Sequence, residues 1–415
     1  MKITMLTVGS TGDVRPYILL GRELLSRGHR ITIATFSRFR EDIEAAGLSY
    51  FPLSGDAEEM MAAIMSPHTG ALRYLPRLEK SLKTVAPLLI RDMSDSCTGA
   101  DAMICNFFGS IYYSIAEKHR IPCIQTHYFP MDPTREIPLS VIKNQRMAGW
   151  MNASTYRLGY LLISGAEKRY LSSWRRENDV SPRKLRTRPD YRVGDHPVPV
   201  IYAISPRVLP RPAEWPSNIH MSGFWFEDAP CAYTPPEDLA RFLAEGPTPV
   251  YIGFGSMNAG DMNRLLAMVM RALHASGLRA VISLGWSGEH YPSGRRVFFA
   301  GGFVPHDWLF PRVRAIVHHG GAGTTASGFR WGRPALVIPF SGDQAFWGSR
   351  VRALGCGPKP IPRDSLTVHR LTRALLDLTG QKQYQENAAA LARALQEEHG
   401  VRQAADLILR EIAAW

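Results

Sequence analysis

The pattern that most constrains the fold of this chain is a short apolar run that leads through a glycine-containing turn into a helical segment. The sequence contains it three times, with the apolar runs at residues 3–8, 250–252 and 315–317. Other runs with strand character alternate with helical patterns, at residues 31–35, 48–53, 102–105, 123–126, 281–284, 297–299 and 335–339. This alternation is typical of parallel sheets covered by helices on both faces, and it predicts an α/β fold.

The length of the chain and a proline-rich stretch near its middle predict two domains. At 415 residues the chain is longer than one ordinary core requires. We place a first domain at residues 1–225, a linker at 226–248 and a second domain at 249–398. Two such units in succession leave a cleft between them, and a last helix at 399–415 is placed to cross back to the first domain.

The turn at residues 318–325 combines two histidines, three glycines and two threonines. A strand that feeds such a turn and then a helix brings free backbone N–H groups and the positive end of the helix dipole to one point. This arrangement suits an anion such as a diphosphate, with threonine hydroxyls and an imidazole N–H as further donors. The alternative is a tight turn whose glycines only permit close packing.

The turn at residues 9–13 lies beyond the carboxyl end of the first strand, where parallel sheets bind ligands. Its spacing is G-x-x-G instead of G-x-G-x-x-G, and the second strand ends without an acidic residue for a ribose. Both features argue against NAD. Pro16 is expected in the first turn of the following helix, which Gly28 ends.

Charge and cysteine content narrow the partners and the compartment. The net charge of +12 favours anionic partners. The five cysteines are scattered, which indicates a reducing cytoplasm and no zinc site. The N-terminus has strand character and lacks the pattern of a signal peptide, and no apolar run is long enough to span a membrane. We therefore expect a cytoplasmic protein, with peripheral contact to a membrane surface left open.

The segment at residues 143–192 differs from the rest in composition. It holds twelve basic and four acidic residues, a net charge of +8, interleaved with six tryptophan or tyrosine residues. Such a segment can lie on an anionic membrane surface or line an apolar pocket, and the alternative is a solvated helix face. Nucleic acid is not expected as a partner, because no recognised binding motif accompanies the charge.

Several ordered motifs carry a family resemblance. The sequence is similar to family 1 glycosyltransferases of the two-Rossmann-domain (GT-B) fold, and most similar to sterol 3β-glucosyltransferases. In the second domain the motifs lie at residues 253–257, 303–310, 318–325 and 339–348. In the first domain they lie at residues 9–17, 37–40 and 210–216. The resemblance covers nearly the whole chain and is weakest over residues 56–200.

Two departures from the family pattern bear on the assignment. The long N-terminal extension that recruits fungal sterol glucosyltransferases to membranes is not expected here, because Met1 directly precedes the first strand. The base histidine of many plant relatives falls at Asp13, which agrees with the bacterial and sterol branches.

The resemblance implies an acceptor-binding first domain, a nucleotide-sugar-binding second domain and one catalytic residue. Asp13 is expected to be the general base; its alternative role is a helix cap, and both roles could coexist. Ser256, His319 and the 321–324 turn would hold the diphosphate, Phe303, Val304 and His306 the uracil, and Asp343 with Gln344 the sugar. The donor-binding residues are therefore Ser256, Phe303, Val304, His306, His319, Gly321, Gly323, Thr324, Asp343 and Gln344.

No cofactor is expected, and a metal is unnecessary, because no Asp-x-Asp pair occurs in the chain to hold a divalent ion on the diphosphate. The function that follows is inverting transfer of glucose from UDP-glucose to a hydroxyl of a lipophilic acceptor such as a sterol. Polyketide, terpenoid and other natural-product acceptors remain open. The alternatives from other classes are a UDP-sugar epimerase or hydrolase and a non-catalytic accessory relative.

Overall fold

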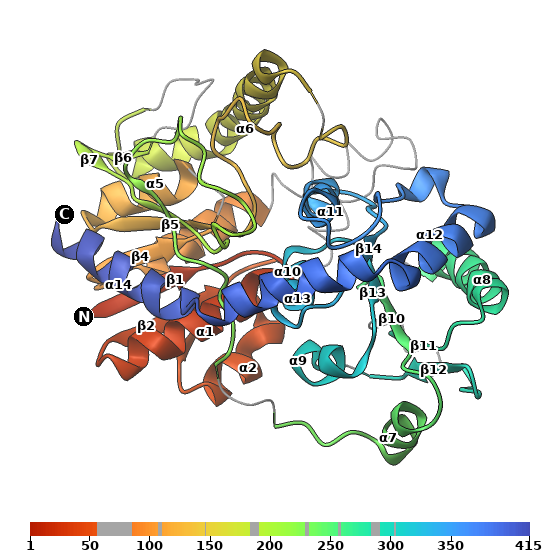
Figure 1. The fold of residues 1–415 in the computed structure, drawn as a ribbon. Coiled ribbons are helices and arrows are strands. Elements are labelled where there is room, and N and C mark those ends of the chain that lie inside the picture. Colours follow the sequence, from red (N-terminus) through yellow and green to blue (C-terminus); the bar gives the residue numbers. More distant parts are fainter. Residues whose placement is uncertain are drawn as a thin grey trace.

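Two parallel sheets, one in each half of the chain, form the centre of the molecule, and they confirm the α/β prediction (Figure 1). The structure is a computed structural model. It describes residues 1–55, 85–106, 110–145, 147–182, 191–228, 232–255, 259–283, 291–302 and 304–415.

The first sheet has seven parallel strands in the order β3-β2-β1-β4-β5-β8-β9. Their bounds are β1 Lys2–Leu6, β2 Arg30–Thr35, β3 Ser49–Pro52, β4 Ala102–Cys105, β5 Cys123–His127, β8 Val200–Tyr202 and β9 Ile219–Met221. Strands β1, β4, β5 and β8 are almost fully buried, as strands covered on both faces must be. Strands β4 and β8 are largely apolar, whereas β5 buries the polar side chains of Gln125, Thr126 and His127. A two-stranded hairpin, β6 Arg192–Val193 and β7 His196–Pro197, lies apart from this sheet.

Helices cover both faces of the first sheet. One face packs against α1 (Thr11–Ser26) and α14 (Gly400–Ala413), which share a core cluster with β1 and β2. The other face packs against the helical residues 85–96 and α5 (Ser110–His119). The remaining helices of this half are α2 (Arg40–Ala45) and α6 (Gly149–Glu177), which stands at the top of Figure 1.

Helix α1 begins earlier than its sequence suggested. Ser10 is the N-cap, and Asp13 lies at the third helical position, where Ser10 and Asp13 form a capping box. Pro16 consequently lies inside the helix, past its first turn, and the prediction for Pro16 was wrong. The helix ends before Gly28, which has a positive φ of 84°.

The second sheet has five parallel strands in the order β12-β11-β10-β13-β14. They are β10 Val250–Gly253, β11 Ala280–Ser283, β12 Val297–Ala300, β13 Ile316–His318 and β14 Ala335–Val337. Helices α8 (Ala259–Ser276) and α12 (Val368–Gly380) contribute to one core cluster with β10 and β11. Helices α10 (Ala322–Arg330), α11 (Gln344–Ala353) and α13 (Lys382–Gln396) contribute to the other.

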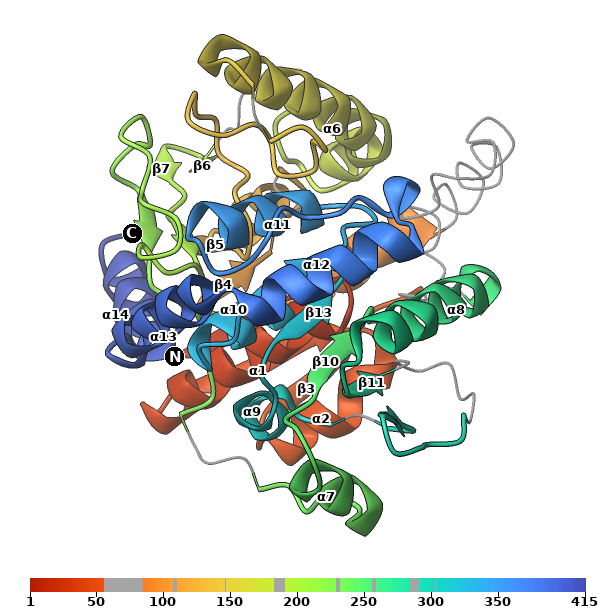
Figure 2. The same ribbon diagram turned by 45° about the vertical axis from the view of Figure 1, so that its right-hand side comes forward.

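Two connections join the halves: one is the stretch expected as a linker, and the other is the last helix, which was expected to cross back to the first domain. The stretch predicted as a linker contains α7 (Glu237–Ala244), which buries Leu239 and Phe242 in the same cluster as Phe298 of β12. Helix α14 crosses to the first half and lies beside α1 in both ribbon views (Figures 1 and 2). The crossing requires Gly400, because a Cβ there would overlap the carbonyl of Phe224. Within the described residues, no helix is both long and apolar enough to cross a membrane.

Candidate active site

Asp13 stands where the first domain meets the second. Its Oδ2 accepts hydrogen bonds from the backbone N–H of Ser10 at 2.7 Å and from the Ser10 hydroxyl at 2.9 Å. Among the described residues no donor to Oδ1 is found, so one oxygen caps the helix while the other is available to a ligand. A Cβ on Gly9 would overlap this carboxylate, so only glycine fits before the cap.

The pKa of Asp13 is raised above its usual value. Burial is the largest cause, and the two hydrogen bonds from Ser10 and the charge of Arg38 act in the opposite direction. A carboxylate with a raised pKa is a stronger base than an ordinary aspartate, and it suits proton abstraction better. The capping role and the base role are therefore compatible on this one side chain.

Two observations bring Asp13 close to the second domain. Ala322, the first residue of α10, packs against the first-domain core cluster that contains Val14, Tyr17 and Tyr128. The charge of Asp13 contributes to raising the pKa of Asp343, which precedes α11. The turn after β1 and the segments after β13 and β14 thus face one another.

The turn at residues 318–325 takes the form that an anion site requires. Strand β13 ends at His318, Gly321 is the N-cap, and α10 begins at Ala322, so the first N–H groups of this helix have no partner within it. Gly323 is exposed and Thr324 is half-buried at this end of the helix. The positive end of the α10 dipole therefore points toward the turn.

The two histidines of this turn have different surroundings. His318 is buried, and its Nδ1 accepts from the N–H of Gly320 at 3.1 Å. The ring of His319 lies between Gly255 and Gly321, since a Cβ on Gly321 would come within 2.6 Å of its Nε2 and one on Gly255 within 3.1 Å of its Cε1. His319 is thus the histidine placed at the turn.

The histidines of the site are neutral at pH 7. Burial lowers the pKa of His319 to about 4 and that of His306 to about 4. The charge of Arg15 is a further cause at His306, which places the start of α1 near α9 (His306–Leu309). A neutral imidazole still donates one N–H, so the positive potential of the turn comes from the backbone amides and the dipole of α10.

The two residues expected to meet the sugar lie at the start of α11. Gln344 is buried, and its Oε1 accepts from the N–H groups of Phe340 at 2.8 Å and Ser341 at 3.1 Å. This pairing uses the amide oxygen and leaves the NH2 group as the donor to a ligand. The half-buried Asp343 accepts from Nε1 of Trp347 at 2.7 Å, and burial raises its pKa to about 6.

Three of the expected donor-binding residues are not part of the geometry described above. Ser256 and Phe303 fall outside the described residues. Val304 is half-buried and packs against a core cluster of the second domain.

His127, the alternative base if Asp13 is only a cap, is buried at the end of β5 with a pKa lowered to about 3 by burial. It is too weak a base and too enclosed for that role.

Three site residues were missed from sequence. Trp347 orients Asp343 by a hydrogen bond. The spacing of four residues between them could have indicated this contact, because side chains four residues apart in a helix are neighbours. Arg15 and Arg38 act electrostatically on His306 and Asp13. Both arginines lie in first-domain motifs, at residues 9–17 and 37–40, but the sequence did not indicate that their charges would act on His306 and Asp13.

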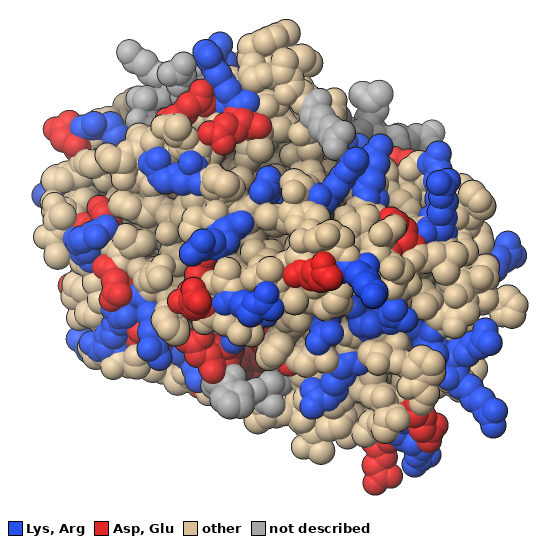
Figure 3. All heavy atoms as spheres, in the orientation of Figure 1, with Lys and Arg blue, Asp and Glu red and all other residues tan. Residues whose placement is uncertain are grey.

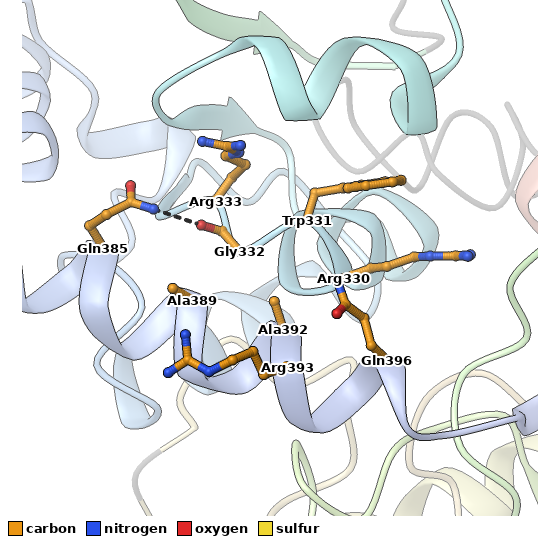
Figure 4. Close-up of a pocket in the computed structure, with 9 residues that line it drawn as sticks. All are labelled: Arg330, Trp331, Gly332, Arg333, Gln385, Ala389, Ala392, Arg393 and Gln396. Carbon is orange, nitrogen blue, oxygen red and sulfur yellow. Dashed lines mark hydrogen bonds between the residues drawn. The ribbon is translucent and has the colours of Figure 1, made fainter. Parts of the chain in front are cut away.

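A separate cavity of about 220 Å³ lies between the end of α10 and α13. Arg330, Arg333 and Arg393 line it, but their guanidinium groups point away from one another (Figure 4). Arg330 donates to the carbonyl of Glu227 and Arg333 to that of Pro311. This arrangement braces the backbone and does not form an anion site.

Comparison with protein families gives two matches. Residues 3–138 match the glycosyltransferase family 28 N-terminal domain. Residues 289–400 match the erythromycin biosynthesis protein CIII-like C-terminal domain.

Comparison with curated proteins gives sterol 3-beta-glucosyltransferases. UGT80A2 of Arabidopsis thaliana is 34% identical over 97% of this chain and 64% of its own length. UGT80B1 of the same plant is 32% identical over 99% of this chain and 68% of its own length. The sterol 3-beta-glucosyltransferase of Yarrowia lipolytica is 33% identical over 99% of this chain, which spans 29% of that protein. The chain therefore spans less than two thirds of the first and the last of these.

Comparison with solved structures shows the fold. The glycosyltransferase of kitacinnamycin matches with a TM-score of 0.72 at 19% identity, covering 99% of this chain and 98% of its own. CalG4, the calicheamicin glycosyltransferase, matches with a TM-score of 0.69 at 17% identity, covering 99% and 98%. Both neighbours are GT-B glycosyltransferases, and the expected fold is confirmed.

Proposed function

We propose, since the chain belongs to the glycosyltransferase family of the sterol 3-beta-glucosyltransferases, that it transfers glucose from UDP-glucose to the hydroxyl of a lipophilic acceptor such as a sterol. The observation that carries the proposal is the position of Asp13 at the start of α1, next to α10, whose first residue Ala322 packs against the first-domain cluster that contains Val14. A base on one domain thereby lies close to the expected diphosphate-binding turn of the other.

The proposed reaction inverts the anomeric carbon. Asp13 takes the proton of the acceptor hydroxyl, and the acceptor oxygen forms a bond to C1 of glucose as the bond from C1 to the diphosphate oxygen breaks. UDP leaves with that electron pair. Its charge is stabilised by the N–H groups at the start of α10, by the helix dipole and by the N–H of His319.

The donor contacts follow from the groups that remain free. The NH2 of Gln344 and a carboxylate oxygen of Asp343 would bind sugar hydroxyls, while Trp347 holds Asp343 in place. The curated relatives are named sterol 3-beta-glucosyltransferases, which supports glucose as the sugar and a sterol as the acceptor.

We propose that no metal takes part, because the start of α10 supplies the stabilisation that a divalent ion provides in other transferases. The sequence offers no Asp-x-Asp pair for such an ion. Activity should therefore be unchanged by EDTA. Loss of turnover on chelation, restored by magnesium, would contradict this part of the proposal.

The experiment is incubation of the protein with UDP-[14C]glucose and a sterol, followed by lipid extraction and assignment of the anomeric configuration by NMR. A β-glucoside formed from the α-linked donor is the expected product. Release of free glucose would indicate a hydrolase, and conversion of the donor to another UDP-sugar would indicate an epimerase. Labelling of a polyketide or other terpenoid alcohol in place of the sterol would keep the mechanism and replace the acceptor.

A further inference from the structure

Helix α6 exposes a row of large apolar side chains, here called the outer face of α6. The exposed fractions are 71% for Trp150, 37% for Met151, 60% for Leu158, 43% for Leu161 and 66% for Leu162. These positions recur at intervals of three, four, seven or eight residues, so they lie on one side of the helix. Five of the eleven exposed large hydrophobic residues in the described part of the chain lie here, and a sixth, Val141, precedes the helix.

The opposite side of α6 already serves the fold. Asn152, Tyr156, Leu171 and Trp174 are buried, and Tyr156 packs with Met131 and Leu139. The outer face is therefore additional to the side that packs on the protein. In the sequence of residues 149–165, Arg157 is the one charged residue. A solvated helix face would carry several charges over this length.

Basic side chains border the outer face. Arg157 is exposed beside it, and Lys168 and Arg176 are exposed further along the helix. Lys168 lies eleven residues, or three turns, beyond Arg157, so both lie at the same edge. The space-filling view shows mostly uncharged surface at the tip where Figure 1 places α6, with both basic and acidic side chains below it (Figure 3).

We propose that the outer face of α6 docks on the surface of a bilayer that contains anionic lipid. A helix with leucine and tryptophan on one side and basic residues at its edge binds this interface by burying apolar area and by attraction to lipid head groups. Tryptophan is favoured at the head-group level, where its ring meets both apolar and polar groups.

A second copy of the chain or another protein fits this surface less well. The outer face consists of five side chains from one protruding helix, whereas a stable interface typically involves about 20–30 residues on each side. Helix α6 carries five basic and two acidic residues, a net charge of +3, which opposes pairing of two copies through this helix and favours an anionic surface.

Docking would also place the cleft near the membrane. The loop after β5 connects the two, because Tyr128 donates a hydrogen bond to the carbonyl of Asp13 at 3.4 Å while Met131 and Leu139 pack against α6. The docking proposal itself is independent of the proposed reaction and of the acceptor.

The test is sedimentation of the full chain with vesicles of phosphatidylcholine, with and without about one quarter phosphatidylglycerol. The wild type is expected to sediment with the anionic vesicles at about 0.1 M salt and less at about 1 M, where the screening length falls from ~10 Å to ~3 Å. The double variant Leu158→Gln, Leu162→Gln should lower the partition coefficient by at least about tenfold. Arg157→Gln with Lys168→Gln should weaken binding to anionic vesicles only.

Leu376→Gln is the matched control, since Leu376 is 50% exposed on α12, away from α6, and this variant should bind as the wild type does. Circular dichroism and UDP calorimetry establish that each variant is folded, and Trp150→Gln replaces the double variant if that one unfolds. Equal binding of wild type and outer-face variants would overturn the proposal, as would absence of wild-type binding. Self-association of the wild type that the leucine variant abolishes, without vesicle binding, would assign the surface to a second copy.

Discussion

At the residue scale, Asp13 shows how one side chain caps a helix with one oxygen and keeps the other for the proposed chemistry. Oδ2 completes the capping box with Ser10, and the turn before it admits only Gly9. From the sequence, Asp13 could be a cap, a base or both. The sequence could not show that the cap uses only one carboxylate oxygen, because this depends on the side-chain rotamer in the folded turn.

The substitution Asp13→Asn should separate these roles. The asparagine side chain would keep an oxygen for the Ser10 donors and lose the basicity, so the melting temperature should change little. Turnover should fall by about 10²–10⁴-fold with UDP-glucose affinity nearly unchanged. Steady-state kinetics and calorimetry measure both quantities.

Retention of more than about a third of the turnover of the wild type, with chemistry rate-limiting, would leave Asp13 as a cap only. Asp343 would then be the base to examine, because it is the carboxylate whose pKa responds to Asp13. Ser10→Ala is the matched control, since it removes one capping donor and leaves the carboxylate in place.

A second prediction concerns His319, whose ring lies against Gly321 at the start of α10. His319→Ala removes an N–H donor to a charged phosphate, a contact worth about 1.5–3 kcal/mol. The dissociation constant of UDP-glucose should therefore rise roughly 10- to 100-fold by calorimetry. Equal affinity in the two proteins would remove His319 from the phosphate site. His318→Ala is no control here, because His318 is buried and holds the Gly320 amide.

At the element scale, the sequence predicted the strands better than it predicted helix α7, which lies in the connection between the domains. Apolar runs bounded by turns mark buried strands, and the strands expected at 102–105 and 123–126 agree with β4 and β5 within one residue. Helix α7 was missed because its eight residues bury only Leu239 and Phe242. The outer face of α6 was not evident either, because an apolar side that packs and one that does not have the same periodicity.

Helix α14 gives the element-scale prediction. Ile408 is fully buried in the cluster that joins α14 to α1 and β1, so Ile408→Ala should destabilise the first domain by about 2–5 kcal/mol. Urea unfolding measures the loss. Gln403→Ala, an exposed position on the same helix, should change stability by less than about 0.5 kcal/mol. Equal effects of the two substitutions would mean that α14 does not hold the domains together in solution.

At the scale of the whole molecule, the site belongs to neither domain alone. One core cluster continues from Tyr202 and Phe224 of the first half to Phe346 and Trp347 of the second. Arg350 of α11 donates to the carbonyl of Val208 through Nε at 2.9 Å and Nη2 at 2.5 Å. The same helix therefore carries the expected sugar-binding residue at its start and a contact to the first domain further along. The family motifs in the sequence predicted which loops would lie at the expected site. The contacts that fix the distance between the loops of the two domains, such as that from Arg350 to Val208, lie outside those motifs.

Burial of titratable groups across the molecule makes stability depend on pH in two opposing ways. Burial lowers the pKa of His127 to about 3 and the pKa values of His306 and His319 to about 4, and it lowers the pKa of His318 well below its usual value. These groups bind protons more readily when unfolded, so their contribution to stability is lost as the pH falls from 6.5 toward 4. Burial raises the pKa of Asp132 to about 7 and of Asp343 to about 6. Those carboxyls hold protons better when folded, so they add stability as the pH falls through these values.

Among the described residues seven histidines have a pKa lowered mainly by burial, and four carboxyls have a pKa raised mainly by burial. The histidines are more numerous, so we predict maximal stability near neutral pH and a decline on acidification. The melting temperature at about pH 4.5 should lie at least about 10 °C below that at pH 7, measured by scanning calorimetry in buffers of equal ionic strength. His127→Gln removes one of the buried imidazoles and should narrow the difference, whereas His369→Gln, at an exposed position, should leave it unchanged. A melting temperature that is equal or higher at pH 4.5 would mean that the carboxyls dominate. In that case Asp132, whose Oδ2 accepts from the Tyr202 hydroxyl at 2.5 Å in the core, would control the acid response of the fold.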